Sequence, residues 1–151
     1  MIKLLDLLEK MTAGEKKEKE KLVKGMKKAK GDFCALQCLS KDSSVSLFTV
    51  GFHAQQAVEK ALKSALFWHA QRCPFTHDIE ALLTLVRQAG IPLPPGSDSM
   101  PMLSPFSALL RYEDEDWQIS NAPDMDTMLV WADGAIQWAQ QQIEGDDPNS
   151  A

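Results

Sequence analysis

The feature that most constrains the fold is a long stretch from Val45 to Gln71 in which apolar side chains recur at helical spacing. These side chains cover a wide arc of a helical wheel. An arc of that width is typical of a central helix in a bundle, which contacts neighbours on several sides. The arc consists of Phe48, Phe52, Ala54, Val58, Ala61, Leu62, Ala65 and Leu66.

Shorter helical patterns flank this segment, and no alternating strand pattern is present. Asp32–Lys41 precedes it, Thr76 can cap a helix after it, and Pro123 begins a last helix. Ile91–Pro105 holds five prolines and is predicted to be a loop, followed by a short helix over Phe106–Tyr112. The sequence therefore predicts an all-α, antiparallel up-and-down bundle of four to five helices. Residues expected to be buried are Phe48, Phe52, Val58, Leu62, Leu66, Leu83, Leu129 and Ile136.

The lysine-rich stretch Gly14–Lys30 has almost no apolar face. We interpret it as a solvated helix extension or a flexible arm, with nucleic-acid contact as the alternative. The predicted organisation is an N-terminal extension over 1–27, a helical bundle over 28–145 and a polar tail over 146–151.

Charge is divided unevenly along the chain. Residues 1–41 hold 11 lysines and 6 acids, whereas residues 42–151 have a net charge of −10. The acidic body disfavours broad, nonspecific DNA binding. No apolar run is long enough for a membrane span and the N-terminus lacks a signal-peptide pattern, so we expect a cytoplasmic protein with no membrane contact.

The cysteines and histidines give little sign of metal chemistry. Cys34 and Cys38 share a helix face, but no further Cys or His completes a zinc set, and two small buried side chains are the simpler interpretation. His53 is predicted to be exposed, His69 partly buried, and His77 to make local hydrogen bonds. We expect no metal and no cofactor.

Two polar residues interrupt the apolar arc of the central segment. Gln55 and Glu59 lie one turn apart on one face. A buried carboxylate needs a partner, because an isolated buried charge is very costly. Lys60 and Lys63 are placed on the outward side, so Arg111, with its planar donor fork, is the expected partner. A purely structural Glu59–Arg111 ion pair remains an open alternative.

Three segments together resemble the HEPN family (higher eukaryotes and prokaryotes nucleotide-binding). Phe52–Gln71 resembles the central helix of the family, Thr76–Leu83 the start of its next helix, and Leu110–Asp114 a later element that contains Arg and Tyr. The resemblance implies a helical bundle that forms a homodimer. It also implies a partner, since many members are encoded beside a minimal nucleotidyltransferase and form toxin–antitoxin pairs with it.

The ribonuclease branch of that family carries an Arg, a short polar run and then a His. Arg111 matches the Arg, but four acids follow Tyr112 and no histidine lies beyond His77. A metal-independent ribonuclease needs a group that moves protons near neutral pH. We therefore predict a non-catalytic module that binds a nucleotide, RNA or a partner protein, and assign no catalytic residue. The expected ligand-binding residues are Arg111, Tyr112, Glu59, Gln55 and Asp114.

Two other functions stay open. One is a divergent ribonuclease toxin in which His77 or Tyr112 carries the proton beside Arg111 and Glu59. The other is a dimeric scaffold in which Arg111 only pairs with Glu59.

Overall fold

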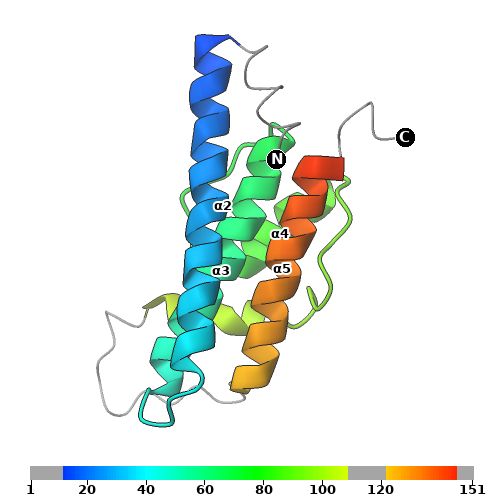
Figure 1. The fold of residues 1–151 in the computed structure, drawn as a ribbon. Coiled ribbons are helices and arrows are strands. Elements are labelled where there is room, and N and C mark those ends of the chain that lie inside the picture. The colour runs from blue at the N-terminus through cyan, green and yellow to red at the C-terminus, as the bar shows by residue number, and fades with distance from the viewer. Residues whose placement is uncertain (1–11, 109–121, 146–151) are drawn as a thin grey trace.

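The computed structural model describes residues 12–108 and 122–145, and all regular structure within these ranges is helical. Figure 1 shows a bundle in which α2 runs antiparallel to α3 and α5, whereas α3 and α5 run in the same direction. No strand occurs in the described ranges, so the all-α prediction is confirmed. The elements are α2 (Ala13–Leu39), α3 (Leu47–Trp68), α4 (Ile79–Gln88), the 3-10 helix η1 (Met100–Ala108) and α5 (Met125–Gly145).

Helix α3 is the central element, and it packs against each of the other four helices. Ser46 caps its N-terminus by accepting a hydrogen bond from the Thr49 amide at 3.2 Å. At the other end the Gln71 amide donates to the Leu66 carbonyl, and Ala70 takes a positive φ of 57°. The side chain of Ala70 makes that turn strained by about 1 kcal/mol, because the left-handed region suits glycine better.

The prediction that Gly14–Lys30 lacks an apolar face is wrong. Helix α2 is continuous from Ala13 to Leu39, so the proposed boundary at residue 27 falls inside it. Its buried side chains recur at alternating intervals of four and three residues, which forms one narrow stripe among the lysines. This stripe consists of Leu22, Met26, Ala29, the half-buried Phe33, and Leu36.

Most of the predicted core is buried. Val58, Leu62, Leu66, Leu83 and Ile136 are buried, as expected. By contrast Phe48, Phe52 and Leu129 are only half-buried. Phe48 packs against the ring of Phe106 on η1, with 6.0 Å between ring centroids.

The proline-rich segment also differs from expectation. Its second half is not a loop, because η1 spans Met100–Ala108 with Pro105 inside it. The packing of η1 on α3 is close: a Cβ at Gly51 would lie 2.2 Å from the Phe106 ring. Only glycine fits at this position of α3, so the glycine sets the distance between the two helices.

The N-cap of α4 is Asp78 and not Thr76. The hydroxyl of Thr76 instead accepts a hydrogen bond from the Asp78 amide.

Among the helices of residues 12–108 and 122–145, none combines the length and apolar character needed to cross a membrane. The cytoplasmic location stays a prediction.

Candidate functional site

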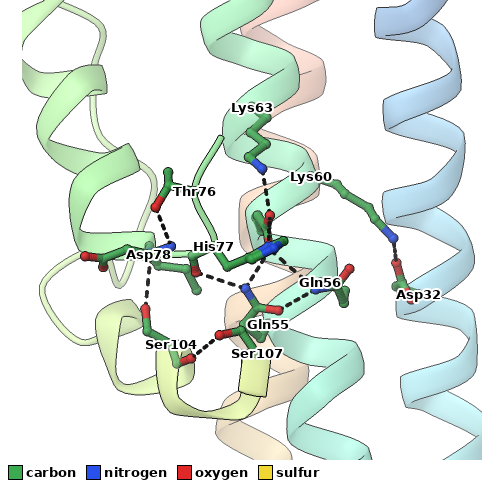
Figure 2. Close-up of polar contacts among 12 residues, drawn as sticks. Asp32, Gln55, Gln56, Lys60, Lys63, Thr76, His77, Asp78, Ser104 and Ser107 are labelled. Atoms are coloured by element: carbon green, nitrogen blue, oxygen red, sulfur yellow. Dashed lines mark hydrogen bonds and ion pairs between the residues drawn. The ribbon is translucent and has the colours of Figure 1, made fainter. Parts of the chain in front are cut away.

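The carboxylate of Glu59 lies inside the fold and is surrounded by donors from its own chain. Its residue is only 4% exposed. One oxygen accepts from Lys63 Nζ at 2.7 Å and contacts His77 Nδ1 at 2.9 Å. The other accepts from Gln55 Nε2 at 2.7 Å and from Gln56 Nε2 at 3.4 Å. We call these five residues the Glu59 cluster; Figure 2 labels the four partners of Glu59, which converge from α3 and the segment before α4.

Gln55 is fully buried, and its amide has partners for both ends. Its Nε2 donates to Glu59 and also to the His77 carbonyl at 3.2 Å, while its Oε1 accepts from Gln56 at 2.7 Å. A buried polar group without partners would be costly, so these bonds explain why the residue is tolerated beside the core. They also tie α3 to the loop that follows it.

His77 is the solvent-facing member of the Glu59 cluster. Its side chain is 55% exposed although Nδ1 contacts a carboxylate that is almost fully buried. The adjacent backbone is anchored to η1, because the Ile79 amide donates to Ser104 Oγ at 3.0 Å, as Figure 2 shows. The imidazole is therefore held in position by both its ring nitrogen and the backbone next to it.

A second carboxylate joins α2 to α3. Asp32 on α2 contacts His53 Nδ1 at 3.1 Å and accepts from Lys60 Nζ at 2.5 Å. We call these three residues the Asp32 cluster. His53 is thus not fully exposed as predicted: its side chain is 27% exposed and paired with an acid on the neighbouring helix. Lys60 likewise points to α2 and not simply outward.

Cys73 lies close enough to the Glu59 cluster for the charges of Lys63 and Glu59 to affect the pKa of its thiol. Burial raises the pKa of its thiol above the usual value; the charge of Lys63 partly lowers that pKa, and the charge of Glu59 raises it further. A thiol whose pKa is raised stays protonated near neutral pH and is a poor nucleophile. Within the described residues no three His, Cys, Asp or Glu side chains are arranged to hold a metal ion.

The predicted site is brought together in part. Gln55 and Glu59 lie in hydrogen-bonding contact, as their spacing indicated. Arg111, Tyr112 and Asp114 lie outside the described residues, so the expected Glu59–Arg111 pair stays a prediction.

Within the described residues, the contacts of Glu59 with Lys63 and His77 were not predicted from the sequence. The interval of four residues between Glu59 and Lys63 is the signal that could have identified the first of them. The expectation that Lys63 points outward is wrong, because its long side chain bends back by one turn to reach Glu59. No local spacing predicts the contact between Glu59 and His77, because His77 lies beyond the end of α3.

Comparison with known proteins adds one finding. The family model described as HEPN domain matches residues 22–142, which is most of the chain. A search of curated proteins found no match. A search of solved structures also found none.

Proposed function

Since the chain belongs to the HEPN family, we propose that it is a non-catalytic module that binds a nucleotide or a protein partner. The observation that carries this proposal is the state of Glu59, whose two oxygens are both occupied by donors of the chain itself. A carboxylate in that state is poorly suited to take a proton from a substrate. The chain also has no histidine after Arg111, where the ribonuclease branch carries one.

The proposed binding site combines the outer side of the Glu59 cluster with Arg111, Tyr112 and Asp114. Helix η1 contacts α3 and ends at Ala108, three residues before Arg111 in the sequence. An arginine close to that end offers a planar fork for a phosphate or a carboxylate. We further propose that the module is a homodimer and the partner of a minimal nucleotidyltransferase in a toxin–antitoxin pair.

Titration calorimetry on one variant tests the proposal. We expect wild-type protein to bind ATP or a short oligoribonucleotide, or to co-purify with a nucleotidyltransferase encoded by an adjacent gene. Arg111→Ala should abolish that binding and leave the melting temperature nearly unchanged. A large loss of stability without any loss of binding would show that Arg111 is structural and would overturn the assignment. Sedimentation at micromolar concentration that gives only monomer would contradict the dimer.

A divergent ribonuclease is the second candidate, and one observation favours it. A histidine whose Nδ1 contacts a buried carboxylate and whose ring is half-exposed has the arrangement of an oriented general base. Here His77 would move the proton that the absent downstream histidine moves elsewhere in the family. Cleavage of RNA in the presence of a chelator, lost in both His77→Ala and Arg111→Ala, would establish this activity and refute the non-catalytic proposal.

A further inference from the structure

The loop between α3 and α4 displays an aromatic ring that the core does not use. Phe75 is 97% exposed, whereas the other exposed large hydrophobic residues of the described ranges, Val23, Met102 and Val130, are between 40% and 68% exposed. A phenylalanine that gains nothing from burial is an informative exception, because its ring would bury a large apolar area elsewhere. The side chain is therefore available for a ligand.

This ring stands on an anchored backbone. On one side the Gln71 amide donates to the Leu66 carbonyl at 2.9 Å. On the other the carbonyl of His77 accepts from the buried Gln55. The ring of Phe75 lies edge-on to that of His77, with 5.7 Å between centroids and 68° between planes. An aromatic side chain held on a fixed loop loses little conformational entropy when it binds a ligand.

The loop itself carries no acidic residue. No Asp or Glu occurs between Lys60 and His77, although Glu59 contacts His77 and Asp78 follows it. Lys60 and Lys63 already contact Asp32 and Glu59. Arg72 is exposed and the His77 side chain is half-exposed. These two residues of the loop are therefore the basic side chains nearest in sequence to Phe75. An exposed ring close in sequence to an arginine and a histidine offers the groups that bind a base and its phosphate.

We infer that residues 69–77 form a stacking site for the base of a phosphorylated nucleotide, with Phe75 under the base and Arg72 and His77 as donors to the phosphate. The ligand is a free nucleotide or one nucleotide of a single-stranded RNA, which share this chemistry. The inference rests on the proposed function and gives it a second contact surface, next to the ring of His77.

Fluorescence anisotropy with a short fluorescein-labelled oligouridylate tests the inference on the full-length protein. Phe75→Ala should weaken binding by about 5- to 150-fold, the usual effect of losing one stacked base, and Phe75→Trp should preserve it. The control is Val130→Ala, which removes a 68% exposed apolar side chain from α5 and should leave binding unchanged. Melting temperatures should be the same for all three variants, since neither side chain is buried.

Competition distinguishes the two sources of the ligand. Displacement of the labelled RNA by ATP indicates a free-nucleotide site, whereas displacement by unlabelled RNA alone indicates that RNA is the ligand. Equal binding by wild type and Phe75→Ala, with loss in Arg111→Ala, would overturn the stacking site while leaving the proposed function intact. Binding of neither probe by wild-type protein would also overturn the stacking site. The proposed function would then depend on co-purification with a nucleotidyltransferase.

Discussion

The Glu59 cluster and the Asp32 cluster place similar side chains around a carboxylate but have different effects on the fold. In each, the carboxylate contacts one lysine and one histidine Nδ1, and the Glu59 cluster adds two glutamines. The Asp32 side chain is 14% exposed and its partners are both on α3, so this cluster fastens two helices side by side. The Glu59 side chain is 5% exposed, and one of its partners is on a loop.

The difference shows what burial and connectivity do to an ion pair. A partly exposed pair gains little, because water competes for both charges. A nearly buried carboxylate depends on its donors, because removing them would leave a desolvated charge. The Glu59 cluster therefore controls the position of a loop, whereas the Asp32 cluster adds a modest contact to helices that already share an apolar stripe.

The largest effect is expected for Glu59→Ala. It removes one of the two acceptors of the fully buried Gln55 amide and releases His77, so the free energy of unfolding should fall by about 1–3 kcal/mol. Urea denaturation measures the loss. Glu59→Gln keeps an acceptor in place and serves as the milder control. An unchanged midpoint in Glu59→Ala would show that the cluster does not stabilise the fold.

Asp32→Ala should cost less, up to about 1 kcal/mol, because Lys60 and His53 are each more than a quarter exposed and can be hydrated instead. The same urea titration checks this value, and it should fall as salt is added. A loss larger than that of Glu59→Ala would reverse the ranking of the two clusters.

His77→Ala should separate stability from binding. The imidazole is 55% exposed, and Lys63 and Gln55 still donate to Glu59 without it, so its removal should lower the melting temperature less than Glu59→Ala does. Under the proposed stacking site, binding of the labelled oligouridylate should nevertheless weaken severalfold. His53→Ala is the matched control in the Asp32 cluster and should leave RNA binding unchanged. Equal effects of the two substitutions on binding would argue against a specific role for the loop.

The smallest effect concerns the thiol of Cys73. Cys34 and Cys38 are exposed and not buried as the sequence indicated. Because burial raises the pKa of the Cys73 thiol, iodoacetamide should modify it more slowly at neutral pH than Cys34 and Cys38. Glu59→Gln removes a charge that raises the pKa of the thiol, so it should speed the reaction, whereas Asp32→Asn should not. Single-cysteine variants and mass spectrometry give the rates.

The raised pKa of Cys73 also has a consequence for stability. A group whose pKa is raised by folding contributes stability below its unfolded pKa and loses it as the pH rises through the folded value. Unfolding free energy should therefore decline on the alkaline side, and Cys73→Ala should remove that part of the decline. An identical alkaline profile in wild type and Cys73→Ala would contradict this reasoning.

Sequence periodicity predicted the helical core well, because apolar spacing along α3 reflects packing directly. The same reasoning failed for α2, since a stripe of one apolar residue per turn is hidden among lysines whose charges dominate the composition. It also failed for η1, where five prolines in the segment indicated a loop although 3-10 geometry tolerates Pro105.

Within the site, the Gln55–Glu59 contact was predictable because both residues are on one helix. The contact between Glu59 and His77 was not, because it depends on where the chain turns after Trp68. That turn includes a left-handed Ala70, a conformation that alanine does not signal in a sequence.

A substitution at Gly51 on α3 would change the position of η1, a helix that lies far from Gly51 in the sequence. Any side chain at position 51 must displace the Phe106 ring, and η1 with it, because the added carbon would lie 2.2 Å from that ring. The end of η1 is three residues from Arg111. A graded series from Gly51 to alanine, serine and valine would therefore displace η1 by increasing amounts without altering any residue proposed to contact a ligand.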